Sequence, residues 1–336
     1  MKHGNTRVGA KVALLAGMAA ILLAGCGSSG GSGDAAGILK QTFTGSHRVS
    51  SGTLSFSVSL QPLGSSPLKG PLGLSFGGPF QSLGAGKLPQ SNFSLDITAL
   101  GRSVSLGILS TGRAGYVNFQ GISYSLPQAE YQKLESSFSS LASGPGSSSG
   151  VLSKLGIQPL RWLNNPTVVG TESVGGTQTT HIRAGINVAA LLHDFNTFLE
   201  RASSLGISGA SSFPHGLSQA TITRVAGEIQ NPSFNLWTGS ADRTIRRLQV
   251  RLTASIHGQL SALLGGSLGI ALNLQYSNLN QPQTITAPTS VAPFTQFEAK
   301  LRSLVSGIQG GLGGALGGSS GPGSSGSSSS STLNKY

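Results

Sequence analysis

The sequence predicts an α+β protein in which one large, curved antiparallel β-sheet (a half-barrel) carries about three helices on its concave face. Apolar and small polar residues alternate along many segments bounded by Gly and Pro, as in half-buried antiparallel strands. Three other segments space their apolar residues three to four positions apart, as amphipathic helices do. The segments run in the order strands, helix, hairpin, helix, long strands and terminal helix, which favours one sheet with helices against one face.

The first 25 residues have the layout of a secretory signal peptide. Basic residues stand at the start, and an apolar run from Val12 to Leu23 leads to small residues. This run is shorter than the roughly 20 residues that a permanent membrane-spanning helix needs, so we expect cleavage. The ending Leu23-Ala24-Gly25-Cys26 resembles the bacterial lipobox. The resemblance implies that Cys26 receives a diacylglycerol and becomes the N-terminus of the mature chain.

Residues 26–36 consist of the lipidated cysteine and a Gly/Ser-rich segment that we expect to be a flexible tether. Because Cys26 is the only cysteine, the exported domain has no intramolecular disulfide. Residues 306–336 are also rich in Gly and Ser, and we expect a disordered tail there. The residues between, 37–305, are predicted to form a single domain.

Alternation predicts one sheet of about nine to eleven strands. Its strands are expected at 53–60, 92–98, 103–109, 115–120, 122–127, 167–174, 177–185, 234–239, 243–256 and 267–277. Gly175-Gly176 and a turn near Gly121 are signals for tight hairpins. The stretch 62–89 is dense in Gly and Pro, and we interpret it as a long, partly mobile insertion in the sheet.

The three helical segments are expected at 128–141, 187–202 and 293–308. The first follows Pro127, and the second is preceded by Asn187 as a plausible N-cap. A twisted sheet of this size tends to curl. The sequence leaves open whether the hollow under the helices is filled with side chains or stays open as an apolar cavity.

Charged residues make up only 10% of the chain, against about 25% in typical domains. The net charge is nevertheless +12, which favours an anionic partner, either nucleic acid or a membrane surface. The sequence has no cluster of Lys and Arg interleaved with aromatic residues, so we expect no nucleic-acid partner. The predicted anchor instead places the domain at the outer face of the cell membrane.

Two stretches resemble a known group of proteins. They are VVGTESVGGTQTTHIRAGINVAALLHDF (168–195) and FNLWTGSADRTIRRLQVRL (234–252). Both are similar to the mycobacterial-type lipoproteins of the LppX/LprG group and, more loosely, to the LolA/LolB lipoprotein carriers. The resemblance implies a curved antiparallel sheet that cradles helices around a hydrophobic cavity for acylated lipids, and it brings no catalytic residues.

The residues that carry chemistry are too dispersed to predict an enzyme. The histidines show no metal-binding spacing, and one cysteine excludes a multi-thiolate zinc site. Matches to the nucleophile pattern G-x-S-x-G fall in the Gly/Ser-rich ends, away from any strand-to-helix turn. No close carboxylate pair and no phosphate-binding loop is present. We therefore predict no catalytic residues, no metal and no cofactor.

Two functions fit these observations. The first is a membrane-anchored exported lipoprotein that binds or transfers lipids or acylated molecules in an apolar cavity. The alternative is a non-catalytic envelope module, for adhesion, sensing or assembly, with a filled core. We expect a monomer with membrane lipids as its partners, and the sequence names no partner protein. In the first case the cavity wall is predicted from alternate apolar positions of the long strands: Phe56, Val58, Leu95, Leu106, Val250, Leu252, Leu272 and Leu274.

Overall fold

The computed structural model describes residues 35–45, 47, 49–66, 70–84, 86–99, 101–142, 156–204, 218–258, 261 and 264–316. Cys26, the predicted signal peptide and residues 317–336 of the predicted tail lie outside this part of the chain. Among the described residues, no helix is long and apolar enough to span a membrane.

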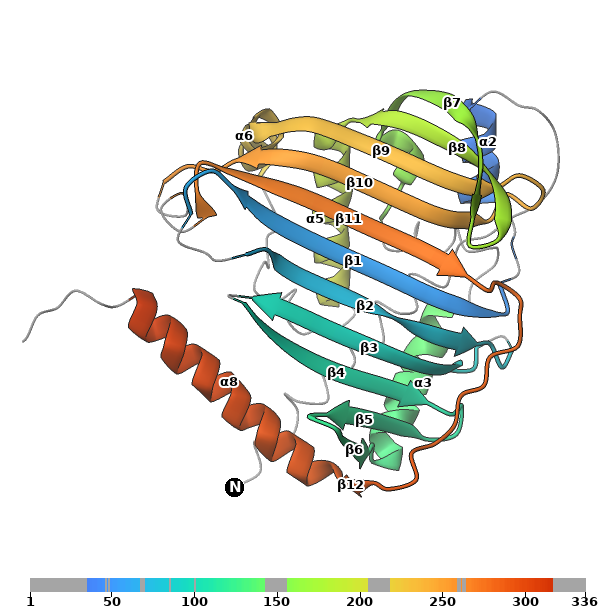
Figure 1. Cartoon of the computed structure of the whole chain (residues 1–336), viewed down its shortest axis with the longest axis vertical. Helices are drawn as coiled ribbons and strands as arrows, with labels where there is room; N and C mark the ends of the chain where they lie inside the picture. The colour runs from blue at the N-terminus through green and yellow to red at the C-terminus, as the bar shows by residue number, and fades with distance from the viewer. Residues whose placement is uncertain are drawn as a thin grey trace, which may run out of the picture. The chain divides into compact units, whose positions relative to one another are not determined.

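The described strands form one twelve-stranded open sheet in the order β12-β6-β5-β4-β3-β2-β1-β11-β10-β9-β8-β7 (Figure 1). Neighbouring strands are antiparallel, except that β12 runs parallel to β6. The α+β fold with a curved, mostly antiparallel sheet is therefore confirmed. The strands are β1 Ser51–Leu63, β2 Leu72–Gln81, β3 Gln90–Ala99, β4 Arg102–Ser110, β5 Gly115–Phe119, β6 Ile122–Ser125, β7 Leu163–Val174, β8 Thr177–Ile186, β9 Ile229–Gly239, β10 Ile245–Ser255, β11 Ser267–Ser277 and β12 Ala292–Pro293.

Two predicted turns are two-residue hairpin turns in the structure. Gly175 and Gly176 have φ values of 57° and 78°, and they join β7 to β8. Gln120 and Gly121, with φ values of 52° and 77°, join β5 to β6 in the same way. Positive φ at both central positions gives the turn the twist of the flanking strands, which explains why the glycines mark these sites.

The prediction that 62–89 is a partly mobile insertion is wrong for its central part, which is strand β2. This strand pairs with β1 on one side and with β3 on the other. Its apolar residues alternate, with Phe76 and Phe80 buried, but Gly77, Gly78 and Pro79 interrupt the pattern. In the sequence, the density of Gly and Pro residues masks this alternation. The strand count rises above the predicted range because β2 and the short β12 were both missed.

Helices α3 and α5 lie behind the sheet in Figure 1, on one of its two faces. α3 spans Gln128–Ala142 and α5 spans Val188–Ser204, as the apolar spacing predicted. Asn187 caps α5, since its side-chain Oδ1 accepts a hydrogen bond of 3.1 Å from the backbone N–H of Ala190.

Two further helices were not predicted. These are α2, Ala35–Thr44, and α6, Gln219–Glu228. α2 begins inside the predicted tether, because the Gly/Ser-rich composition before it masks the short apolar pattern of Ile38, Leu39 and Phe43. α6 follows the Gly/Ser-rich stretch that ends at 216 and is capped by Ser218, whose hydroxyl accepts from the backbone N–H of Thr221.

The last described helix, α8, spans Phe294–Leu316. The described residues up to Phe294 form one compact unit, and the described residues from Thr295 onward form another. The predicted domain boundary at 305 falls inside α8, and 306–316 is helical where a disordered tail was expected. The glycines in this stretch weaken a helix by about 1 kcal/mol each relative to alanine without forbidding helical geometry.

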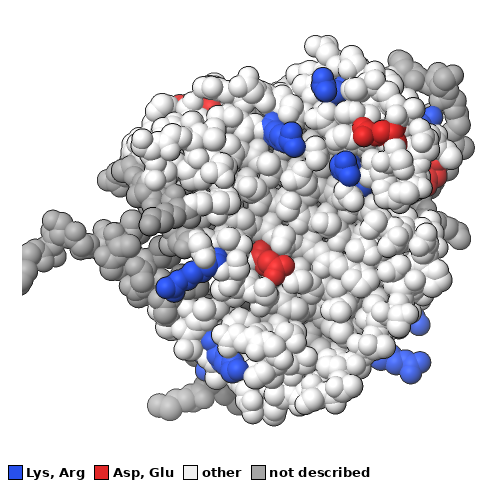
Figure 2. All heavy atoms as spheres, viewed as in Figure 1, with Lys and Arg blue, Asp and Glu red and all other residues white. Residues whose placement is uncertain are grey.

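The face of the sheet seen in Figure 2 carries few charged side chains, and these are scattered. Ser, Thr, Asn and Gln occupy many of the outward positions of the strands, such as Ser55 and Ser57 in β1 and Asn273 in β11. The opposite face carries the apolar core. Its buried residues are Ala35, Ile38, Leu39, Leu54, Phe56, Phe76, Phe80, Phe93, Leu95, Ile182, Ala184, Ile186, Phe234, Leu236, Ile245, Leu274 and Tyr276.

Candidate functional site

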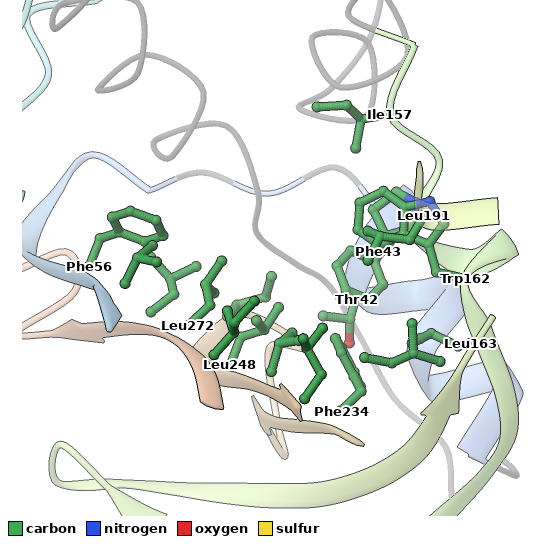
Figure 3. A pocket seen from close by; sticks show the side chains of 18 of the residues that line it. Thr42, Phe43, Phe56, Ile157, Trp162, Leu163, Leu191, Phe234, Leu248 and Leu272 are labelled. Atoms are coloured by element: carbon green, nitrogen blue, oxygen red, sulfur yellow. The ribbon is translucent and has the colours of Figure 1, made fainter. Parts of the chain in front are cut away.

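A pocket of about 480 Å³ lies between the apolar face of the sheet and a wall formed by α2, the 156–163 segment and α5 (Figure 3). Its volume lies within the roughly 300–1,000 Å³ typical of small-molecule sites. The lining residues are Thr42, Phe43, Phe56, Val58, Ile157, Pro159, Trp162, Leu163, Ile186, Leu191, Phe234, Ile245, Leu248, Val250, Leu252, Ile270, Leu272, Leu274 and Tyr276.

The sheet side of the pocket follows from alternation and register. In β10, Leu248, Val250 and Leu252 face the pocket, and the residues between them face the other way. The register places Val250 beside Leu272 of β11, and Leu272 in turn beside Val58 of β1. Cross-strand neighbours share a face of the sheet, so these apolar side chains form a continuous floor.

This floor extends across six neighbouring strands, from Phe56 in β1 to Leu163 in β7. Strands in a sheet lie about 4.8 Å apart, so the five steps from β1 to β7 amount to about 24 Å along the sheet. Figure 3 shows Phe56 toward one end of the pocket and Trp162 toward the other.

The pocket stops at β1 because aromatic rings fill the same face of the next two strands. Phe76 of β2 and Phe93 of β3 lie with ring centroids 4.8 Å apart, and both are buried. Phe80 of β2 is also buried and contacts Tyr276 edge-on. These rings occupy the space that would otherwise continue the pocket toward β3 and β4.

Helix α2 supplies part of the opposite wall through Thr42 and Phe43. The Thr42 hydroxyl donates to the carbonyl of Ile38 at 2.9 Å, as a helical threonine commonly does. It also lies 3.0 Å from the hydroxyl of Thr238 in β9. Because this hydroxyl has partners on its own helix and on the sheet, it adds little polarity to the pocket.

The 156–163 segment supplies Ile157, Pro159, Trp162 and Leu163, and it contains a short 3-10 helix, η1, Pro159–Arg161. The segment is held to α5 by Asp194, whose side chain is only 2% exposed. Asp194 Oδ2 accepts from the backbone N–H of Gln158 at 2.6 Å and from the indole N–H of Trp162 at 2.9 Å. Hydrogen bonds to a carboxylate are stronger than those between neutral groups.

Six of the eight predicted wall residues line this pocket: Phe56, Val58, Val250, Leu252, Leu272 and Leu274. Leu95 and Leu106 lie outside it. They belong to β3 and β4, where Leu95 is in the buried core and Leu106 packs against that core. The predicted lipidation site, Cys26, is outside the described residues.

The helical wall of the pocket was not predicted from the sequence. Leu191 belongs to the apolar stripe of a predicted helix, and Trp162 lies between the predicted elements, but neither position indicates a pocket by itself. Thr42 and Phe43 were missed with their helix. These residues meet only through tertiary packing, so sequence periodicity carries no signal for the contact.

The chemistry of the pocket is almost wholly apolar. Among the described residues that line it, only Thr42, Trp162 and Tyr276 bring polar side-chain atoms to the pocket. In the described part of the chain, no group of three His, Cys, Asp or Glu side chains is placed to hold a metal ion. A cavity of this kind favours an apolar ligand, because apolar walls offer water no hydrogen-bond partners.

Beside the β9–β10 turn lies a cluster of ionisable side chains. Partial burial lowers the pKa of His47 to about 4; the nearby charge of Asp242 opposes this shift, and that of Arg246 adds to it. Burial alone would raise the pKa of Asp242, but hydrogen bonds from Thr244 and Arg246 outweigh burial and lower it. Arg246 Nη2 lies 2.7 Å from Asp242 Oδ2.

No family model matches the chain, and no curated protein matches it. Among solved structures, the chain is similar to LprF from Mycobacterium bovis, with 15% identity and a TM-score of 0.33 over 76% of this chain and 94% of that one. The Mycobacterium tuberculosis lipoprotein LppX has 14% identity and a TM-score of 0.31 over 82% and 99%. A LolA superfamily protein from Nitrosomonas europaea has 10% identity and a TM-score of 0.19 over 75% and 96%. LppX and the LolA proteins are also named in the resemblance that the sequence shows.

Proposed function

We propose that this protein is an exported, membrane-anchored lipoprotein that binds or transfers lipids or acylated molecules, with an acyl chain in the apolar pocket. The observation that carries this proposal is the pocket itself, about 480 Å³ in volume and lined by apolar side chains from six neighbouring strands and the opposite wall. An unbranched acyl chain matches this lining because it needs no hydrogen bonds.

The energetics of burial support an acyl ligand. Each buried methylene contributes about 0.8 kcal/mol, so a chain of about 16 carbons gains roughly 13 kcal/mol before the entropy of association is subtracted. Burial of this size permits stable binding without a polar contact. The alternative of an envelope module with a filled core fits less well, because no side chain of the described residues occupies the pocket.

The proposed anchor supports the same function. The chain between Cys26 and Ala35, the first residue of α2, extends at most about 30 Å. Thr42 and Phe43, near the other end of α2, line the pocket. A diacylglycerol on Cys26 would therefore keep the pocket close to the outer face of the membrane, where acylated molecules are found.

A pair of substitutions in β11 tests the proposal. Leu272→Trp fills the pocket, whereas Asn273→Trp puts the same side chain on the opposite face of the sheet. We expect the parent chain to bind a fluorescent fatty acid saturably and to carry lipid in native mass spectrometry. Leu272→Trp should weaken this binding at least tenfold, and Asn273→Trp should leave it unchanged.

Thermal melting of the same variants separates an open pocket from a filled core. An open pocket accommodates the indole of Leu272→Trp, so the melting temperature should stay close to that of the parent. In a filled core the same change would cost about 1–3 kcal/mol through overpacking. Absence of bound lipid and of probe binding in the parent would refute the proposed function.

A further inference from the structure

Trp162 forms the wall of the pocket at the end farthest from Phe56. It stands beside Leu163, the first residue of β7, and β7 is the last strand of the sheet on this side. In Figure 3 its ring lies with Phe43 and Leu191, opposite the end where Phe56 lies. A ligand chain that lies along the floor from β1 toward β7 therefore meets this ring.

The position of Trp162 is set from three directions. Its indole N–H donates to Asp194 of α5, its backbone N–H donates to Pro159 at 3.1 Å, and its carbonyl accepts from the N–H of Asn187 at 2.6 Å. Asp194 also holds the start of the segment through Gln158. The buried carboxylate thus fixes both the backbone and the ring of this wall.

The other tryptophan of the chain has a similar bond without lining the pocket. Trp237 in β9 donates its indole N–H to Glu172 of β7, and it stacks on His181 with ring centroids 4.3 Å apart. Arg247 lies 5.3 Å from the Trp237 ring centroid. Because neither Trp237 nor Glu172 lines the pocket, this pair is a matched control within the same chain.

We propose that Asp194 is a positioning residue that holds Trp162 as the end wall of the pocket, and that this wall sets the length of acyl chain that the pocket accepts. The inference rests on the proposed acyl-binding function. Each additional buried methylene raises affinity about fourfold until the chain reaches the wall, after which the affinity stops rising.

The test measures the affinity of the full chain for a series of unbranched saturated fatty acids of increasing length. The parent should show a plateau beyond one chain length. Trp162→Ala should move the plateau to longer chains, with about a fourfold gain for each added methylene. Asp194→Asn keeps the shape of the side chain but removes its charge. In this variant the affinity should stop rising at a different chain length or should level off more gradually. The variant should also release a bound probe roughly tenfold faster, as expected when hydrogen bonds to a charged group are weakened. Glu172→Gln should change neither.

The fluorescence emission of Trp162 reports on this wall without any ligand. With Trp237→Phe as the background, Trp162 is the only tryptophan, and Asp194→Asn should shift its emission to longer wavelength as the ring becomes more solvated. If Trp162→Ala lowers the melting temperature, Trp162→Leu provides a smaller apolar wall.

Two results would overturn the proposal. One is an unchanged plateau in both Asp194→Asn and the Trp162 variant that retains the parent melting temperature. The other is unchanged Trp162 emission in Asp194→Asn. If the parent binds no fatty acid, the proposed function and the length limit both fail, while the emission still decides whether Asp194 holds the wall.

Discussion

Substitution of Gly78 by alanine should destabilise the sheet strongly. Gly78 lies inside β2 with φ of +147°, a conformation that residues with a side chain rarely adopt. A Cβ atom built on Gly78 would overlap the carbonyl oxygen of Asn92 in β3. It would also lie 2.9 Å from the Asn92 carbonyl carbon and 3.1 Å from Cα of Phe93. All three are backbone atoms of a paired strand, so they cannot move without opening the β2–β3 ladder.

The expected loss of stability follows from these two effects. A side chain in such a conformation costs about 1–3 kcal/mol, and a clash in a packed region costs about 1–3 kcal/mol more. Together they amount to a loss of about 2–6 kcal/mol. At about 2.1 cal/mol/K of unfolding entropy per residue, that loss lowers the melting temperature of a unit of this size by roughly 4–11 °C.

The control is Gly73→Ala in the same strand. Of the described atoms, a Cβ atom on Gly73 would meet Thr98 Cβ at 3.8 Å and the Val58 carbonyl oxygen at 3.9 Å, which are ordinary contacts. Its stability should stay within about 1 kcal/mol of the parent. Thermal unfolding followed by circular dichroism measures both variants. If Gly78→Ala melts at the temperature of Gly73→Ala, the close pairing of β2 with β3 at Gly78 is wrong.

Three further predictions concern pH and the anchor. The unfolded chain takes up a proton on His47 near its ordinary pKa of 6.5, whereas the folded chain does so only near 4. The free energy of unfolding should therefore fall as the pH drops from about 6.5 to 4. In denaturant titrations, His47→Gln should reduce this dependence of the unfolding free energy on pH. An unchanged dependence would contradict the burial of His47. The pKa of Asp242 is held below its ordinary 3.8, so its stabilising contribution should be lost only at still lower pH, and Asp242→Asn should remove that lower phase. Cys26→Ser should prevent lipidation and move the protein from the detergent phase to the aqueous phase in phase partitioning; a variant that stays in the detergent phase would refute the anchor.

The sequence was sufficient for the elements whose signals are local. Gly175 and Gly176 predicted their hairpin because a two-residue turn with positive φ needs glycine or a few polar residues. The alternation in β10 and β11 predicted which residues share the apolar face, since side chains point to opposite faces at every step. The same rule brought six of the predicted residues, among them Val250 and Leu272, to one pocket.

The prediction from the sequence was wrong where two local patterns in the same segment indicated different structures. In β2, the alternation that includes Phe76 and Phe80 competed with the Gly and Pro residues at 77–79, and pairing with β1 and β3 decides in favour of a strand. Gly78 illustrates the reason. A glycine that is a turn signal in isolation is required here because a neighbouring backbone approaches it.

By itself, the sequence determined the fold class, most strands and the apolar face, because each depends on residues that are close together along the chain. Only the tertiary structure decided where the apolar face is open. Phe76 and Phe93 fill it beside β1, so Leu95 and Leu106 lie outside the pocket. Asp194 holds Trp162 at the other end through residues more than thirty positions apart in the sequence. Contacts between distant segments set the size and ends of the pocket, and no periodic pattern encodes them.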